Sequence, residues 1–204
     1  MICNIFAGAD ISDYSWVKPE NGYNIAADRG LIHCQRLGIA PDLILGDFDS
    51  YGGRFPEKAD ILRAPAEKDD TDTMLAVKCG FEHGCDDFRI YGGLGGRFGH
   101  TAANIQTLMY IMSHGGKGYL YGGEYDITVQ QNGCEEYADR GYRYVSLFAL
   151  SERCEAELSG LKYSGRVSFA NDFPLGASNE FSEKTCKIKV FSGKLLIVFE
   201  KNVT

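Results

Sequence analysis

Residues 88–100 read FRIYGGLGGRFGH, an apolar strand pattern that passes through a glycine-rich loop into a helical pattern. The same order of strand and helix occurs throughout the first 120 or so residues. The expected strands are 2–6, 24–27, 42–45, 60–63, 88–91 and 119–121, and the expected helices are 30–37, 71–82 and 100–113. This alternation predicts an α/β domain with a mostly parallel sheet, in which ligands bind beyond the carboxyl ends of the strands.

The pattern changes after about residue 125, where no long helical period remains. Strands are expected at 142–148, 155–161, 186–191 and 195–199, and Ser192 with Gly193 is expected to form a hairpin turn between the last two. We therefore predict an α/β domain over residues 1–124 and an all-β sandwich domain over residues 125–204.

Composition excludes several classes of protein. The chain has 204 residues and a net charge of −7, which argues against broad binding to nucleic acids or anionic membranes. No apolar run approaches the roughly 20 residues that span a bilayer, and the first residues lack the basic start of a signal peptide. The seven cysteines are odd in number and contain no Cys-x-x-Cys pair, so we expect reduced thiols in the cytoplasm.

Two carboxylates follow the expected strand at 42–45, in the segment LILGDFDS of residues 43–50. Asp47 and Asp49 would lie at the end of the sheet that presents ligands, and Mg²⁺ is commonly held by one or two carboxylates together with substrate phosphates. A turn in which these side chains bond their own backbone is the alternative interpretation.

A second acidic segment, EKDDTD at residues 67–72, directly precedes an expected helix. Thr71 or Asp70 would cap this helix, or Lys68 would contact phosphate while Asp72 binds a metal. Between residues 42 and 72 there are nine acids and four bases, and two acidic strand ends would repel each other without a cation between them. This charge balance favours a metal site.

The glycine loop of residues 92–96 is the third candidate for chemistry. Its backbone N–H groups can approach a phosphate closely, the helix behind it adds its positive end, and Arg97 can act as a clamp. The spacing matches neither a Walker A loop nor a clean Gly-x-Gly-x-x-Gly motif, and a flexible loop is the alternative. His100 would be a base, a cap or a surface residue, and Asp28 a substrate contact or a helix N-cap.

Taken together, these motifs resemble the thiamine pyrophosphokinase family over nearly the whole chain. The residues that carry the resemblance are Asp28-x-Gly30, Gly46-Asp47-x-Asp49-Ser50, Lys68-Asp69-x-Thr71-Asp72, Gly95-Gly96-Arg97-x-Gly99-His100 with Asn104, and Ser178-Asn179. The resemblance implies an α/β domain joined to a β-sandwich, in a homodimer with active sites at the subunit interface. It also implies transfer of the terminal pyrophosphate of ATP to the hydroxyl of thiamine, giving thiamine diphosphate and AMP.

The resemblance further implies a role for individual residues. Mg²⁺ would be bound by Asp47, Asp49 and Asp72, which would carry catalysis together with Arg97. ATP would be bound by Asp28, Lys68, Asp69, Thr71, Gly95, Gly96, Arg97 and His100. Thiamine would be bound by Asn104, Ser178 and Asn179.

One position departs from the family pattern, because Gly99 stands where the family has Asp. This departure motivates one alternative, a thiamine- or nucleotide-binding homologue with weakened or lost turnover; in a rewired enzyme, His100 or Asp70 would compensate for the missing acid. Another Mg²⁺-dependent enzyme, such as a phosphatase of the haloacid dehalogenase type, is the second alternative. Formation of AMP that depends on thiamine and Mg²⁺ discriminates among the three.

Overall fold

The computed structural model describes residues 1–46, 56, 59–63 and 69–202. The chain divides into two compact units, Met1–Gly123 and Glu124–Thr204.

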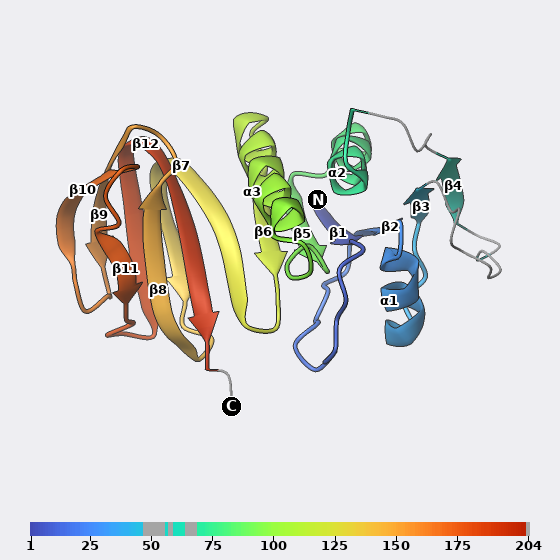
Figure 1. Cartoon of the computed structure of the whole chain (residues 1–204), viewed down its shortest axis with the longest axis horizontal. Helices are drawn as coiled ribbons and strands as arrows, with labels where there is room; N and C mark the ends of the chain where they lie inside the picture. The colour runs from blue at the N-terminus through green and yellow to red at the C-terminus, as the bar shows by residue number, and fades with distance from the viewer. Residues whose placement is uncertain (47–55, 57–58, 64–68, 203–204) are drawn as a thin grey trace. The chain divides into compact units, whose positions relative to one another are not determined.

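The first unit alternates strands and helices (Figure 1). Its strands are β1 (Ile2–Phe6), β2 (Tyr23–Ala27), β3 (Leu43–Gly46), β4 (Asp60–Arg63), β5 (Asp87–Tyr91) and β6 (Lys117–Tyr121). Its helices are α1 (Gly30–Leu37), α2 (Asp72–Glu82) and α3 (Phe98–Ser113). The strands pair in the order β6-β5-β1-β2-β3-β4, and all these pairs are parallel. The predicted parallel α/β architecture is thereby confirmed for this unit, although α3 begins two residues before its predicted start.

Helices cover both faces of this sheet, as the view in Figure 1 shows. On one face, Leu31 and Cys34 of α1 pack in a buried cluster with Phe6 and Ile44 of the sheet. On the other face, Gly80 of α2 lies so close to the sheet that a Cβ atom there would be 2.6 Å from the ring of Phe88. Successive side chains of a strand point to opposite faces of the sheet. A core on both faces therefore requires apolar residues at consecutive positions of each strand.

The order of the strands reverses at β1, which has β2 on one side and β5 on the other. The connection after β1 therefore runs toward β2, whereas the connection after β5 runs toward β6 on the other side. A crevice forms between these two connections. Open α/β sheets bind ligands at such a switch point. The fold thus predicts that the loops after β1 and β5 line the ligand site.

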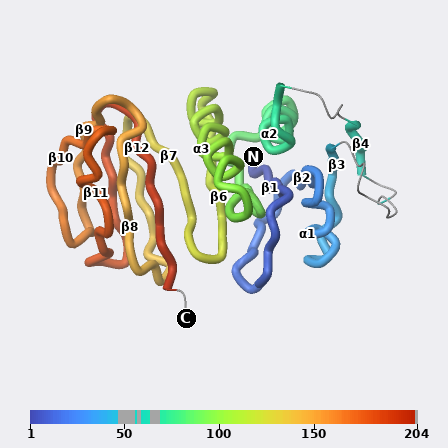
Figure 2. The backbone as a smooth tube through the Cα atoms, viewed as in Figure 1, coloured from blue at the N-terminus to red at the C-terminus, as the bar shows by residue number. Residues whose placement is uncertain are grey.

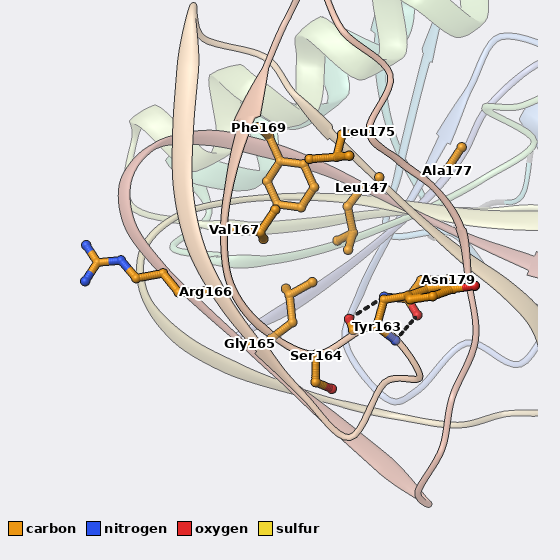
Figure 3. A pocket seen from close by; sticks show the side chains of 12 residues that line it. Leu147, Tyr163, Ser164, Gly165, Arg166, Val167, Phe169, Leu175, Ala177 and Asn179 are labelled. Carbon is orange, nitrogen blue, oxygen red and sulfur yellow. Dashed lines mark hydrogen bonds between the residues drawn. The ribbon is translucent and has the colours of Figure 1, made fainter.

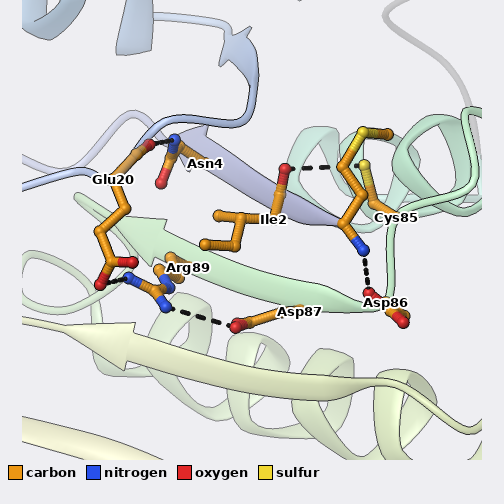
Figure 4. Close-up of polar contacts among 8 residues, drawn as sticks. Ile2, Asn4, Glu20, Cys85, Asp86, Asp87 and Arg89 are labelled. Atoms are coloured by element: carbon orange, nitrogen blue, oxygen red, sulfur yellow. Dashed lines mark hydrogen bonds and ion pairs between the residues drawn. The ribbon is translucent and has the colours of Figure 1, made fainter.

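Polar contacts hold the amino-terminal region of this unit (Figure 4). Arg89 of β5 forms an ion pair with Glu20, and Asn4 of β1 donates from Nδ2 to the Glu20 carbonyl at 2.8 Å. The Met1 ammonium pairs with Asp86 just before β5. These contacts fasten the segment between β1 and β2 to the sheet at its Glu20 end.

The second unit is antiparallel and contains β7 (Tyr125–Ala138), β8 (Tyr142–Ala149), β9 (Arg153–Ser159), β10 (Gly165–Ala170), β11 (Gly176–Asn179) and β12 (Thr185–Lys201). The long strands β7 and β12 run side by side, as the tube in Figure 2 shows. The first part of β12 also pairs with β9, and its last part pairs with β8. β10 extends the sheet beyond β9, and β11 pairs with β8.

The predicted hairpin turn at Ser192 and Gly193 is wrong, because both residues lie inside the continuous strand β12. The pairing with β7 shifts between Val190 and Lys194, so the two residues form an irregularity of the β-bulge kind. Gly193 has φ +84°, and a Cβ atom there would lie 2.2 Å from the Arg153 carbonyl oxygen. The glycine therefore supplies a left-handed bulge residue, and the sequence signal for a bulge resembles that for a turn.

All seven cysteines are free thiols, and most are buried. Burial raises the pKa of Cys34 and of Cys186 to about 12, and that of Cys154 to about 11. Such thiols are unreactive small core residues, as expected. Over the described part of the chain, the helices are too short or too polar to span a bilayer.

Candidate functional site

A cavity of about 420 Å³ lies at the carboxyl ends of β1, β2 and β5, at the switch point of the first unit. The loops after these strands and the first turns of α2 and α3 form its wall. Among the residues predicted for the site, those that line the cavity are Asp28, Thr71, Asp72, Gly95, Gly96, Arg97, His100 and Asn104. Residues far apart in the sequence therefore meet at this edge of the sheet.

The glycine loop owes its course to close backbone packing. Gly92 has φ +68°, and a Cβ atom on it would lie 2.6 Å from the Ala7 carbonyl oxygen. Gly95 and Gly96 also have positive φ angles of 92° and 65°, with no described atom within 4 Å of an added Cβ. The first glycine is thus required by packing against the loop after β1. The other two give the loop a backbone conformation that leaves it open to the cavity.

Helix α3 presents an uncompensated positive end to this cavity. Arg97 occupies its N-cap position in an extended conformation and makes no side-chain cap bond, and the first turn contains no acidic residue. Arg97 is exposed and contacts the ring of His100 one turn later. The start of this helix, with its dipole and the nearby guanidinium, can bind an anion such as a phosphate group.

Asn104, one turn after His100 in α3, binds the backbone of the glycine loop. Its Nδ2 donates to the Gly93 carbonyl at 2.7 Å, and the side chain is buried. This contact assigns Asn104 a structural role that the sequence did not reveal, since the residue was singled out only as a thiamine contact.

Helix α2 begins with a cap that was one of two predicted possibilities. The Thr71 hydroxyl accepts a hydrogen bond from the Met74 N–H at 3.1 Å, so Thr71 is the N-cap. Asp70 instead forms an ion pair with Lys78 at 2.6 Å and does not line the cavity. Asp72, the first residue of the helix, does line it. Asp70 is therefore engaged elsewhere, which argues against it as a substitute for the acid missing at residue 99.

Asp28 follows β2 in a strained backbone conformation, with φ +53°. Its N–H donates to the Leu45 carbonyl at 2.8 Å, which fixes the turn against β3. The N-cap of α1 is Arg29, so the alternative of a capping role for Asp28 is wrong. A left-handed non-glycine residue in a cavity wall is a feature that binding sites commonly retain.

Several predicted residues are not part of this cavity as described. Asp47, Asp49 and Lys68 lie outside the described residues. Asp69 is exposed and does not line the cavity. Among the residues that the structure describes, no three His, Cys, Asp or Glu side chains are grouped closely enough to hold a metal ion.

Ser178 and Asn179 lie in the second unit, where Asn179 lines a pocket of about 460 Å³ (Figure 3) and Ser178 is not among the lining residues. Asn179 is buried, its Oδ1 accepts from the Tyr163 N–H at 3.0 Å, and its Nδ2 donates to the Tyr163 carbonyl at 2.9 Å. Ser178 is exposed at φ +58°, and its N–H donates to the Ser146 hydroxyl at 3.1 Å. The amide of Asn179 thus fixes the backbone at Tyr163, and the apolar side chains of Leu147, Phe169 and Leu175 line the rest of the pocket.

The loop of residues 7–10 was missed by the sequence analysis, although all four residues line the cavity. Its backbone is held to the glycine loop, because Ala7 N–H donates to Tyr91 O at 2.7 Å and Ala9 N–H donates to Gly92 O at 2.9 Å. Asp10 forms an ion pair with Arg29 at 2.8 Å, and both residues line the cavity. The available signal was the run Ala-Gly-Ala-Asp directly after a buried strand, at the same sheet edge as the glycine loop.

Comparison with known proteins gives consistent results. The family described as thiamin pyrophosphokinase, catalytic domain, matches residues 16–120. A curated protein named thiamine pyrophosphokinase from Bacillus subtilis is 33% identical over 179 residues, which is 78% of this chain and 79% of that protein.

Solved structures are also similar over the full chain. The crystal structure of thiamine pyrophosphokinase from Bacillus subtilis has a TM-score of 0.90 and 26% identity, with 100% of both chains covered. That of a thiamin pyrophosphokinase family protein from Enterococcus faecalis has a TM-score of 0.84 and 26% identity, with 99% of both chains covered.

Proposed function

The chain belongs to the thiamine pyrophosphokinase family, and on this premise we propose that it transfers the terminal pyrophosphate of ATP to the hydroxyl of thiamine, giving thiamine diphosphate and AMP. The observation that carries the proposal is the cavity at the switch point, where a glycine loop, a helix N-terminus and Arg97 converge within the region that matches the family. The comparisons do not favour a phosphatase of another family.

The cavity supports a binding site for the triphosphate of ATP. The reaction attacks the β-phosphorus, so negative charge has to be balanced along the whole triphosphate. Gly95 and Gly96 offer backbone N–H groups, and Arg97 offers a guanidinium at the start of α3. Electrostatic stabilisation and positioning supply most of the rate of phosphoryl transfer, and these groups serve both purposes.

Asp72 is the described residue that fits a magnesium ion. Its carboxylate is placed on the cavity wall, and Mg²⁺ prefers one or two protein carboxylates that leave positions for phosphates and water. We propose that Asp72 binds Mg²⁺ together with Asp47 and Asp49. The ion would neutralise charge on the phosphates of ATP.

We propose that Asn104, Ser178 and Asn179 bind thiamine. We also propose that residues 125–204 form a β-sandwich domain. The contacts of the two asparagines give them a positioning role, since Asn104 holds Gly93 and Asn179 holds Tyr163. Ser178 is exposed, which is compatible with a direct contact to the substrate. Asp28, Lys68, Thr71 and His100 remain our proposed residues for ATP, whereas Asp69, which does not line the cavity, stays a prediction from the motif alone.

We also propose that the protein is a cytoplasmic homodimer. The seven unpaired cysteines support the cytoplasmic location, and the family resemblance supports the dimer. Sedimentation at the protein concentration of the activity assay tests the dimer, and a fully active monomer would contradict it.

The decisive experiment for the activity measures AMP released from ATP in the presence and absence of thiamine and of Mg²⁺. We expect AMP only when both are present, with thiamine diphosphate formed in equal amount. Release of inorganic phosphate without thiamine would identify a phosphatase. Binding of both ligands without any product would identify a homologue that has lost turnover.

A further inference from the structure

The wall of the cavity that is formed by residues 7–10 is held from two sides. The sheet side is fixed by the backbone bonds of Ala7 and Ala9 to β5 and its loop. On the other side, the ring of His33 in α1 lies with Nε2 2.9 Å from the Ala9 carbonyl oxygen. His33 is 5% exposed and does not itself line the cavity. The carbonyl of Ala9 is therefore bound by a buried side chain from a helix that packs behind the loop.

The partners of the His33 ring determine its tautomer. A carbonyl oxygen only accepts hydrogen bonds, so Nε2 carries the proton and donates to Ala9. In the neutral ring Nδ1 is then an acceptor, and the Tyr14 hydroxyl donates to it at 2.7 Å. The hydroxyl in turn accepts a weak bond from Arg36 Nη1 at 3.4 Å. Tyr14, His33 and Ala9 thus form one directed chain of hydrogen bonds.

The surroundings keep this imidazole neutral. Burial is the main cause that lowers the pKa of His33, and the positive charges of Arg36 and Arg29 act in the same direction. The Ala9 carbonyl and the Asp10 carboxylate oppose them by raising this pKa. A protonated ring would also direct a second N–H at the Tyr14 hydroxyl, which would have to reverse its own bond. Protonation therefore costs the Tyr14 half of the chain.

We propose that His33 is a positioning residue for the nucleotide, which fixes the Ala9 carbonyl, and with it the wall formed by residues 7–10, in the conformation that receives ATP. This inference rests on the proposed function, because it assigns the cavity to ATP. His33 touches no reacting atom in this arrangement. Its loss should weaken nucleotide binding and leave the chemical step and thiamine binding nearly unchanged.

The test compares His33→Leu with His33→Gln. Leucine fills a similar volume without a donor, whereas the glutamine amide can reach the Ala9 carbonyl in place of Nε2. We expect His33→Leu to raise the KM for ATP and the Kd of a non-hydrolysable Mg-ATP analogue about fivefold, the effect of one lost hydrogen bond of ordinary strength. His33→Gln should restore most of the affinity. The value of kcat and the KM for thiamine should change less than twofold.

A matched control is His83→Leu, because His83 ends α2 and stacks on Tyr23 outside the cavity. It should leave both KM values unchanged. The third variant, Tyr14→Phe, removes the donor to Nδ1 and leaves the ring in place. That donor selects the tautomer with the proton on Nε2, which is the one that binds the Ala9 carbonyl. Its removal should therefore weaken binding of the ATP analogue about twofold, less than His33→Leu does, without changing the KM for thiamine.

Two outcomes overturn the proposal while the wild-type enzyme makes AMP normally. One is a folded His33→Leu variant with unchanged affinity for the ATP analogue. The other is an equal loss for ATP and thiamine that glutamine does not rescue, which would mean a general structural effect. Should His33→Leu not fold, a folded Tyr14→Phe variant with unchanged affinity for the ATP analogue overturns the proposal. Should the wild type itself fail to bind ATP, the proposed function fails first and this inference falls with it.

Discussion

Restoring an acid at residue 99 is the most informative perturbation of this chain. Gly99 is the second residue of α3, in a first turn without acidic residues and behind an N-cap that makes no side-chain bond. It does not have a left-handed φ, and no described atom lies within 4 Å of a Cβ built on it. The Gly99→Asp change is therefore free of both the backbone strain and the steric conflict that a glycine position can impose.

The expected gain in stability follows from two effects. Replacing a glycine within a helix contributes a few tenths of a kcal/mol, and a carboxylate in the first turn contributes about 0.3–1 kcal/mol through the helix dipole. The sum of about 1 kcal/mol raises the melting temperature by roughly 2–4 °C for a chain of this length. If the carboxylate also contacts the metal or the thiamine hydroxyl, as the family resemblance implies, thiamine-dependent AMP formation should rise about tenfold, which corresponds to about 1.4 kcal/mol.

The assay measures melting temperature and AMP formation for Gly99→Asp, Gly99→Asn and Gly99→Ala together. Alanine reports helix propensity alone, asparagine adds the shape of the side chain, and aspartate adds its charge. We expect all three to be folded, with aspartate the most stable and only aspartate faster than the wild type. A stabilised Gly99→Asp variant with unchanged or lower turnover would refute the reasoning that this chain lacks a catalytic acid.

Three further predictions concern the cavity and its support. Asp47→Asn and Asp49→Asn should each lower turnover at least about a hundredfold with the fold retained, because metal-mediated charge neutralisation supplies several kcal/mol. Gly92→Ala should lower the free energy of unfolding by about 1–3 kcal/mol in denaturant titration, because its φ of +68° and the close Ala7 carbonyl leave no room for a methyl group. The pKa of His33 is lower in the folded protein than in the unfolded chain, so the unfolded chain binds a proton more readily. The free energy of unfolding should therefore fall as the pH drops below the unfolded pKa of about 6.5. His33→Gln should lack this part of the pH dependence.

Each of these predictions has its own control. Asp60→Asn alters an exposed acid of β4 and should leave turnover unchanged, so near-normal rates for both site variants at saturating Mg²⁺ would contradict the metal assignment. Gly84→Ala changes a glycine that also has a left-handed φ but has no described atom within 4 Å of an added Cβ. An equal loss of stability in this variant would mean that the loss at Gly92 comes from φ alone. An identical loss of stability in acid for wild type and His33→Gln would exclude His33 as its source.

The sequence alone determined the local structure of the first unit. Helix α1 has the predicted bounds Gly30–Leu37, and β1 has the predicted bounds Ile2–Phe6. Such patterns are reliable because hydrophobic periodicity and glycine positions report the local backbone and its burial. The family motifs added the proposed substrates, since they combine residue types whose chemistry suits phosphate and Mg²⁺.

Only the tertiary structure decided which residues meet. The strand order places the loop after β1 beside the loop after β5, so Ala9 contacts Gly92 although 83 positions separate them. His33 reaches this loop because α1 packs on the same side of the sheet, and no local pattern marks it. The continuity of β12 could not be predicted for a related reason. A bulge and a hairpin turn both use a left-handed glycine, and only the pairing with the neighbouring strand, here β7, distinguishes them.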